Sequence, residues 1–288
     1  MNSETLYFGY GSNLDRADWV GWCTKKGYDA PDLVPVEAAW LPGYSLRFHY
    51  HSTGRGGGAA DVVPDGAGTA VPGMLFSLSE EAWDLVDEKE GHPRYYERCP
   101  VRVLTASGAV VEAITYVVVA KKKQPHLVPP TAAYEAIVRQ GLVEYNLPIE
   151  HLKFAIEKFE AKSTLDHVFV YGTLMEGEQR WPQLRPWSSG AQRGTVTGAL
   201  YHLGAYPGMR LDKDGMVHGE LHRCDDMANA LAALDHIEGC DDEDPLAGLY
   251  LRLPVPVQVD GGVVWAWTYV INQLPPNAKR IEDGRWVA

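Results

Sequence analysis

Two glutamates, Glu90 and Glu238, stand in the same local sequence and are the strongest candidates for acid–base chemistry. Each lies in an Asp-x-x-Glu-Gly segment, at residues 87–91 and 235–239, and a Tyr-x-Arg motif follows each segment. A lone Glu at the end of a surface helix is usually solvated. The repeated context favours a functional role, because a glycine after Glu marks a helix end at which the carboxylate can turn inward over a neighbouring loop.

A strand that ends in Tyr-Gly lies upstream of each glutamate. The sequences are YFGYGSNL at residues 7–14 and VFVYGTL at residues 168–174. The aromatic and aliphatic residues predict a buried strand. The glycines after Tyr10 and Tyr171 predict a turn that is closed to bulkier residues and leaves main-chain N–H groups approachable. Such a loop is suited to hold a carboxylate or a carbonyl oxygen.

The same two signals, in the same order in both halves, indicate a duplicated unit. A chain of 288 residues is long enough for two domains, and 45% apolar residues support a core in each. We place the domains at residues 1–163 and 164–288. The mixture of strand and helix patterns predicts an α+β fold for both.

The first half mixes short strands and helices. A helix is predicted over residues 15–25. The glycine-rich residues 53–58 predict a flexible connection, because the Lys-Ser/Thr pair of a phosphate-binding loop is absent. Ser77 is the predicted N-cap of a helix that runs to about Lys89. The remaining predictions are strands at 5–9, 44–51, 69–76 with a break at 72–73, 98–104 and 109–119, a solvated linker at 121–125, and helices at 131–143 and 149–161.

The second half repeats this plan with fewer insertions. A helix is predicted over residues 226–236, directly before Glu238. The predicted strands cover residues 168–171, 194–203, 216–223, 251–259 and 263–271.

The composition of the chain limits the kinds of partner it can bind and the cellular compartment in which we expect it. The net charge of −12 argues against nucleic acids and anionic membrane surfaces as partners. Four widely spaced cysteines without a C-x-x-C pair fit reduced thiols. Residues 1–5 lack the pattern of a signal peptide, and no apolar stretch is long enough to span a bilayer. We therefore expect a cytoplasmic protein.

These motifs together resemble the γ-glutamylcyclotransferase family. In the first half the resemblance covers roughly residues 4–160, through the segments 8–14, 87–91, 128–134 and 141–148. The second half is similar to the AIG2-like branch of the family, through the segments 171–174, 203–208, 235–239 and 281–286. The resemblance implies two tandem domains, each a mixed barrel-like sheet with external helices, and a helical pair added to the first.

The resemblance also implies an activity. In γ-glutamyl cyclotransfer, the α-amine of a γ-glutamyl amino acid, peptide or amine attacks its own γ-carbonyl, so that 5-oxoproline and a free amine are released. Because the nucleophile is intramolecular, we expect no metal and no cofactor. Glu90 takes the acid/base role by resemblance, as does Glu238 in the second half. The alternatives are a γ-glutamyl group on a lysine side chain, polyamine or carrier protein, and a module that binds small metabolites without turnover.

The residues around the substrate follow from the same resemblance. Leu174 stands where the first half has Asn13, and the second half has no counterpart of Tyr134, so the substrate of the second site stays open. The implied substrate-binding residues are Tyr7, Phe8, Gly9, Tyr10, Gly11, Ser12, Asn13, Leu14, Tyr96 and Tyr134 in the first half, and Tyr171, Gly172, Thr173, Leu174 and Tyr250 in the second.

Two other constellations are less favoured. His218, Glu220 and His222 share one face of a predicted strand, whereas the zinc motif H-E-x-x-H requires a helix and a Glu directly after the first His. Cys240 lies two residues after Glu238, but no signature of a thiol nucleophile surrounds it.

Overall fold

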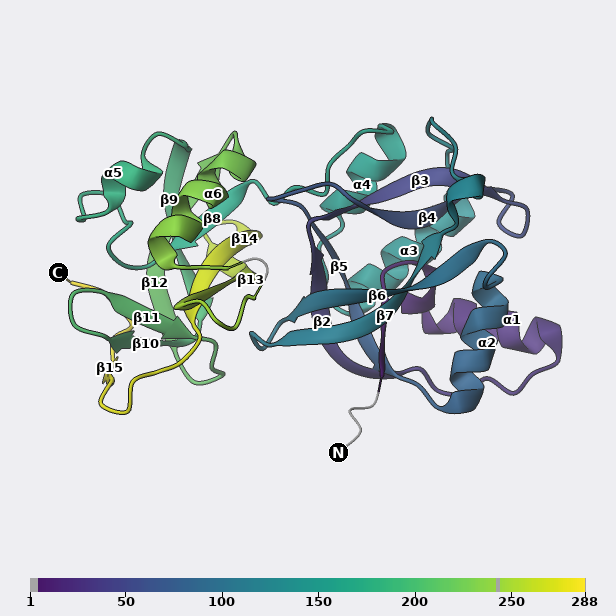
Figure 1. Cartoon of the computed structure of the whole chain (residues 1–288), viewed down its shortest axis with the longest axis horizontal. Helices are drawn as coiled ribbons and strands as arrows, with labels where there is room; N and C mark the ends of the chain where they lie inside the picture. The colour runs from purple at the N-terminus through teal and green to yellow at the C-terminus, as the bar shows by residue number, and fades with distance from the viewer. Residues whose placement is uncertain (1–4, 242–243, 288) are drawn as a thin grey trace. The chain divides into compact units, whose positions relative to one another are not determined.

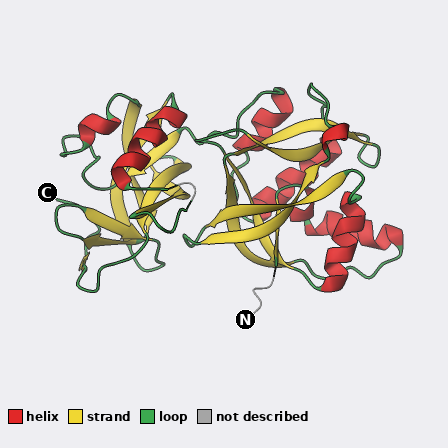
Figure 2. Cartoon of the chain, viewed as in Figure 1, coloured by secondary structure: helices red, strands yellow, loops and turns green. Residues whose placement is uncertain are grey.

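The chain forms two compact units (Figure 1). Of the described residues, the first comprises 5–105 and 111–164, and residues 106–110 group with those from 165 onward in the second. The structure is a computed structural model that describes residues 5–241 and 244–287. Within these residues, each unit contains one closed five-stranded β-barrel. Helices lie outside the strands (Figure 2). The predicted α+β fold with two tandem mixed barrels is therefore confirmed.

The barrel of the first unit has the strand order β1, β5, β2, β6, β7. Its strands are β1 (Leu6–Gly9), β2 (Val34–Pro42), β5 (Ala70–Ser77), β6 (Tyr96–Thr105) and β7 (Val110–Val118), with a separate two-stranded sheet of β3 (Tyr44–Ser52) and β4 (Gly57–Pro64). The helices are α1 (Arg16–Lys26), α2 (Glu80–Glu90), α3 (Ala132–Glu144) and α4 (Glu150–Glu157), and the 3-10 turns are η1 (Ser12–Leu14) and η2 (Ala120–Lys122).

The barrel of the second unit has the strand order β12, β8, β14, β13, β9. Its strands are β8 (His167–Val170), β9 (Ser188–Thr197), β12 (Met216–Cys224), β13 (Tyr250–Val259) and β14 (Gly262–Ile271), and a three-stranded sheet holds β10 (Ala199–His202), β11 (Pro207–Arg210) and β15 (Lys279–Ile281). The helices are α5 (Trp181–Leu184) and α6 (Met227–Glu238).

The first strand of each unit has the same neighbours. β1 pairs antiparallel with β5 and parallel with β7, and β8 pairs antiparallel with β12 and parallel with β14. Phe8 and Phe169 are fully buried in these strands. A Cβ atom added to Gly73 would lie 2.6 Å from the Phe8 ring, and one added to Gly219 would lie 2.7 Å from the Phe169 ring. Glycine at these two positions therefore lets the barrel close around a large aromatic side chain.

The helices that carry the two glutamates begin at polar caps and end at glycines. The Ser79 hydroxyl accepts the Ala82 N–H at the start of α2, so the prediction that Ser77 caps this helix is wrong. Ser77 is instead the last residue of β5, where its backbone belongs to the sheet. Gly91 and Gly239 end α2 and α6 in the left-handed conformation, with φ of 66° and 63°.

Three predictions around glycines were wrong: two interpreted glycine as a break in a strand, and one continued a strand through a glycine that divides it. The glycine-rich residues 53–58 include the start of β4, because a Cβ on Gly58 would collide with the Val128 carbonyl and only glycine fits there. β5 runs through Pro72-Gly73 without interruption. The strand predicted at 194–203 divides at Gly198, where a Cβ atom would lie 2.7 Å from the Arg210 oxygen. The sequence analysis also missed β2, the rest of β4, α5, β11 and β15.

Substitution of Gly219 by Ala should destabilise the second barrel strongly. The added methyl group would meet the Val170 carbonyl oxygen and the Phe169 ring, and backbone cannot yield as a side-chain tip can. We expect a loss of about 3 kcal/mol in the free energy of unfolding, measured by urea titration. The control is Gly21→Ala in the exposed face of α1, where nothing lies within 4 Å. It should be neutral or stabilise by up to about 1 kcal/mol, and equal effects of the two variants would contradict the close-packing argument.

Candidate functional site

The Tyr-Gly loops begin where β1 and β8 leave the barrels. Neither glycine has a positive φ, so neither turn depends on a left-handed backbone. Gly11 has φ −116° and leads into η1. At Gly172 the reason for glycine is close approach, because a Cβ atom would lie 2.5 Å from the Pro207 ring.

In the first unit, Glu90 and the Tyr-Gly loop line the same small cavity. The Asn13 side-chain amide donates to the Glu90 carboxylate at 2.8 Å and to the Tyr7 hydroxyl oxygen at 2.9 Å. Burial raises the pKa of the Glu90 carboxyl, and this outweighs the nearby Lys89 ammonium and the Asn13 hydrogen bond, which lower it. The cavity is lined by Tyr7, Tyr10, Gly11, Ser12, Asn13, Ala60, Glu90, Tyr96, Tyr116 and Tyr134.

Three of the predicted residues do not line this cavity. Phe8 is fully buried in the barrel, and Leu14 is fully buried in contact with Gly141 of α3. Gly9 lies in β1 against the ring of Phe76. These three residues pack in the protein interior and support the loop there.

Two cations are held behind the cavity wall by Asp18. Lys89 Nζ lies 2.8 Å from Asp18 Oδ2 and donates to Asn13 Oδ1 at 2.7 Å. Arg55 pairs with both oxygens of Asp18 and donates to the Ser12 hydroxyl at 3.0 Å. Burial lowers the pKa of Lys89, although Asp18 opposes this shift. The sequence analysis missed this network, because its members are far apart in sequence and no motif links them.

Strand β4 fixes the two tyrosines on the far wall. The Tyr96 hydroxyl donates to the Ala60 carbonyl at 2.8 Å, and the Ala60 N–H donates to the Tyr134 hydroxyl at 3.4 Å. Burial raises the pKa of Tyr134 to about 12, so its hydroxyl stays protonated at neutral pH. Tyr134 comes from α3, and it therefore depends on a helical pair that has no counterpart among the described residues of the second unit.

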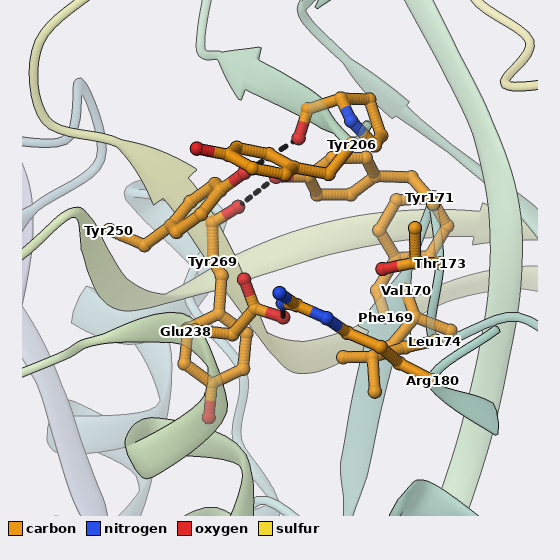
Figure 3. A pocket seen from close by; sticks show the side chains of 12 residues that line it. Phe169, Val170, Tyr171, Thr173, Leu174, Arg180, Tyr206, Glu238, Tyr250 and Tyr269 are labelled. Carbon is orange, nitrogen blue, oxygen red and sulfur yellow. Dashed lines mark hydrogen bonds and ion pairs between the residues drawn. The ribbon is translucent and has the colours of Figure 1, made fainter. Parts of the chain in front are cut away.

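The second unit has a corresponding cavity around Glu238 (Figure 3). Burial raises the pKa of Glu238 to about 7, with the Arg180 guanidinium acting in the opposite direction. The Tyr250 hydroxyl donates to the Pro207 carbonyl at 2.6 Å. The lining residues are Phe169, Val170, Tyr171, Gly172, Thr173, Leu174, Arg180, Tyr206, Pro207, Glu238, Tyr250 and Tyr269. All the site residues predicted for this half are therefore brought together, and the additions are Phe169, Val170, Arg180, Tyr206, Pro207 and Tyr269.

A tyrosine on the last barrel strand joins the glutamate helix to the Tyr-Gly loop. In the first unit, the Tyr116 hydroxyl donates to Asp87 of α2 at 2.5 Å, while its backbone carbonyl accepts the Tyr10 hydroxyl at 2.7 Å. Arg98 donates to the same Asp87 carboxylate at 2.9 Å. We call Asp87, Arg98 and Tyr116 the Asp–Tyr–Arg clamp of the first unit.

The second unit has the same clamp, formed by Asp235, Arg252 and Tyr269. The Tyr269 hydroxyl donates to Asp235 at 2.8 Å, its carbonyl accepts the Tyr171 hydroxyl at 2.6 Å, and Arg252 pairs with Asp235. The clamp explains the Asp of the Asp-x-x-Glu-Gly segments and the Arg of the Tyr-x-Arg motifs. A Thr-Tyr pair at 115–116 and again at 268–269 is the signal that could have revealed the tyrosine.

The less favoured constellations have structural roles. Glu220 and His222 are buried neighbours on β12, with His222 Nε2 3.2 Å from Glu220 Oε2, and Glu220 accepts the Glu176 N–H at 2.7 Å. The Cys240 thiol donates to the Tyr250 carbonyl at 3.0 Å. Lys123, predicted as part of a solvated linker, lies 2.9 Å from the buried Asp61 carboxylate. Across the described residues, no helix is long and apolar enough to span a membrane.

Comparison with known proteins identifies the family of the chain. The model of the family "Gamma-glutamyl cyclotransferase, AIG2-like" matches residues 7–136 and again residues 168–288. A γ-L-glutamyl-butirosin B γ-glutamyl cyclotransferase of Niallia circulans is 29% identical over 110 residues, which are 38% of this chain and 69% of that protein. A Vibrio cholerae protein that carries the family's name is 34% identical over 120 residues, which are 41% of this chain and 93% of that protein. The chain belongs to the γ-glutamyl cyclotransferase, AIG2-like family and carries its domain twice.

Solved structures show the same similarity. One γ-glutamyl cyclotransferase is 24% identical with a TM-score of 0.45, and the match covers 54% of this chain and 87% of that one. YkqA from Bacillus subtilis is 26% identical with a TM-score of 0.46, and the match covers 55% of this chain and 56% of that one.

Loss of a clamp hydroxyl should destabilise the unit that contains it. Tyr116→Phe and Tyr269→Phe each remove a hydrogen bond to a carboxylate and keep the ring, so we expect a loss of about 1.5–3 kcal/mol in the free energy of unfolding. Tyr28→Phe is the matched control, because the exposed Tyr28 hydroxyl donates to Glu88 at 2.9 Å. Its loss should change the stability by less than about 0.5 kcal/mol. A clamp variant as stable as this control would contradict the clamp.

The raised pKa of Glu238 makes the stability of the second unit depend on pH. Between the ordinary glutamate value and about 7, the folded state keeps a proton that the unfolded state has lost, so stability falls as the pH rises through this window. Glu238→Gln should therefore be more stable than wild type at pH 8, by at most about 3 kcal/mol, and the difference should vanish near pH 4. Chemical unfolding at both pH values measures it. The exposed Glu282→Gln is the control, and a constant difference between Glu238→Gln and wild type at both pH values would contradict the raised pKa.

Proposed function

We propose that the protein catalyses γ-glutamyl cyclotransfer. The observation that carries this proposal is the presence, in each unit, of a carboxylate with a raised pKa that lines a small cavity together with a Tyr-Gly loop. Membership of the family supports the reaction class. The substrate is a γ-glutamyl amino acid, peptide or amine, and the products are 5-oxoproline and the free amine.

The proposed reaction needs one carboxylate at each site. Glu90 or Glu238 accepts a proton from the α-ammonium group, and the freed amine attacks the γ-carbonyl carbon of the same molecule. A C–N bond forms and the five-membered ring closes. The bond to the leaving nitrogen breaks as the carboxyl returns the first proton to it, and the ring nitrogen then gives up a second proton, through the carboxylate, to the departing amine. Because nucleophile and carbonyl share one molecule, the protein must hold the chain curled but need not bring two reactants together.

The surrounding residues then have defined roles. Backbone N–H groups of the loop at Gly11 and Ser12 steady the oxyanion or the α-carboxylate in the first domain. Asn13 orients Glu90, and Tyr96 and Tyr134 form the wall opposite. In the second domain, Thr173 and Leu174 take the loop positions, with Tyr171 and Tyr250 as walls. We propose residues 1–163 and 164–288 as the two functional domains, with the first as the main cyclotransferase.

The nature of the leaving group separates the remaining possibilities. The name of the Niallia circulans relative specifies a γ-L-glutamyl group on butirosin B, which supports testing a range of carriers of the γ-glutamyl group. A lysine side chain, a polyamine or a carrier protein could hold the γ-glutamyl group here. A module that binds such metabolites without turnover is the alternative from another class, and the two retained glutamates favour turnover over it.

Glu90→Gln should abolish most turnover on the preferred substrate while KM changes little. Glutamine keeps the size of the side chain but cannot take a proton, and loss of a general base lowers the rate by about 10²–10⁴-fold. The measurement is release of 5-oxoproline from a panel of γ-glutamyl compounds by wild type, Glu90→Gln, Glu238→Gln and the double variant. Glu238→Gln should spare the activity of the first domain and remove any activity specific to the second.

Glu88→Gln is the matched control for this experiment. Glu88 lies in the same helix but is exposed, and it pairs with Lys26 and Tyr28 rather than facing the cavity. This variant should keep wild-type activity. If Glu238→Gln removed all turnover and Glu90→Gln none, the main activity would belong to the second domain. If neither substitution mattered, the carboxylate mechanism would be wrong.

A further inference from the structure

Arg180 places a positive charge in the wall of the second cavity. The residue precedes α5, and its N–H donates to the Thr173 carbonyl at 2.7 Å, so the chain turns back toward the Tyr-Gly loop. Its guanidinium lies 3.8 Å from Glu238 Oε1, 3.5 Å from the Ile237 carbonyl, and 5.9 Å from the centre of the Tyr206 ring. Figure 3 shows Arg180 and Glu238 pointing toward one another in the cavity.

The donors of this guanidinium are only loosely engaged. The separation of 3.8 Å from Glu238 is longer than a hydrogen bond, and the side chain of Arg180 is 36% exposed. In the first domain Arg55 differs, because it grips both oxygens of Asp18 and also the Ser12 hydroxyl, and it does not line the cavity. The N–H groups of Arg180 are therefore available to donate to a ligand carboxylate. Those of Arg55 already donate to Asp18 and Ser12.

The pair of Arg180 and Glu238 matches the head of an α-amino acid. The reaction proposed above requires the α-ammonium group to face the Glu238 carboxylate. The α-carboxylate of the same substrate is attached to the same carbon, so it must lie close to whatever stands beside Glu238. The Arg180 guanidinium, 3.8 Å from the Glu238 carboxylate, stands where it can meet the substrate's α-carboxylate.

We propose that Arg180 binds the α-carboxylate of the γ-glutamyl substrate in the second domain and thereby sets its specificity for a free α-amino-acid head. The inference rests on the proposed function, since it states which side chain meets each charged group of the same substrate. It also makes the two domains different. The second holds the head by a side-chain ion pair, and the first, whose lining contains no arginine or lysine among the described residues, holds it by the loop.

The test uses the full chain with Glu90→Gln, so that only the second domain turns over substrate. Two substrates, γ-glutamylglycine and γ-glutamylmethylamine, differ in the leaving group, and the α-carboxamide of γ-glutamylmethylamine lacks the α-carboxylate. Arg180→Gln should lower kcat/KM by about 10–100-fold on both substrates, mainly through KM, because a charge-assisted hydrogen bond is lost. The carboxamide should be a poor substrate for both proteins, with no further loss from the substitution. Arg180→Lys should restore part of the activity.

A binding measurement separates this inference from the proposed function. L-glutamine has the same head and a γ-amide, and L-glutaminamide lacks only the α-carboxylate. By calorimetry of the full chain, the site in the second domain should prefer L-glutamine by about 10-fold or more. Arg180→Gln should remove this preference and leave binding at the first site unchanged. If no 5-oxoproline forms but this preference depends on Arg180, the cyclotransferase function fails and the carboxylate site stands. The exposed Arg185→Gln, which carries the same change of charge, should have no effect on binding or turnover.

Three results would overturn the inference. A loss on γ-glutamylglycine but not on γ-glutamylmethylamine would mean that Arg180 binds a carboxylate of the leaving group. An equal loss on the α-carboxamide would mean that Arg180 acts on Glu238 or on the fold. Absence of both turnover and binding of L-glutamine would contradict the carboxylate site directly.

Discussion

The structure depends on a carboxylate that is held, unfavourably, at the C-terminal end of a helix inside the protein. Glu90 and Glu238 are the last residues of α2 and α6. The C-terminal end of a helix carries partial negative charge, and burial removes water from the carboxylate. Both effects favour the protonated form, and burial is the main cause of the raised pKa of each glutamate. For Glu238 the pKa of about 7 lies near neutral pH, as acid–base catalysis requires.

Each domain opposes this penalty with a cation, but in a different way. In the first, Lys89 acts through the Asn13 amide, and Asp18 holds it in place. In the second, Leu174 replaces the amide, and Arg180 stands in the cavity itself. The duplicated unit has therefore kept the glutamate and changed the group that balances it. Arg180 lines its cavity whereas Lys89 does not line the first, so the walls of the two cavities differ in charge.

The clamp explains why these glutamates stay in place. One tyrosine in each unit contacts the glutamate helix through its hydroxyl and the Tyr-Gly loop through its backbone carbonyl. The two parts of the site are thus fixed to a single residue of the barrel wall. Close packing at Gly73 and Gly219 seats the first strand of each barrel against its neighbour, which sets the point at which the loop leaves the sheet.

The sequence by itself determined the duplication, the α+β fold, the two glutamates and most of the loop residues, because these are local patterns repeated at two places in one chain. It could not assign the glycines correctly, since Gly58 and Gly73 belong to strands for reasons of contact with distant backbone and side chains. Only the tertiary structure decided that Phe8 and Leu14 face the core, and that Arg55 is occupied whereas Arg180 lines a cavity. The physical reason is that burial and the balance of charge depend on which residues are in contact in the folded chain. Spacing along the sequence does not specify these contacts.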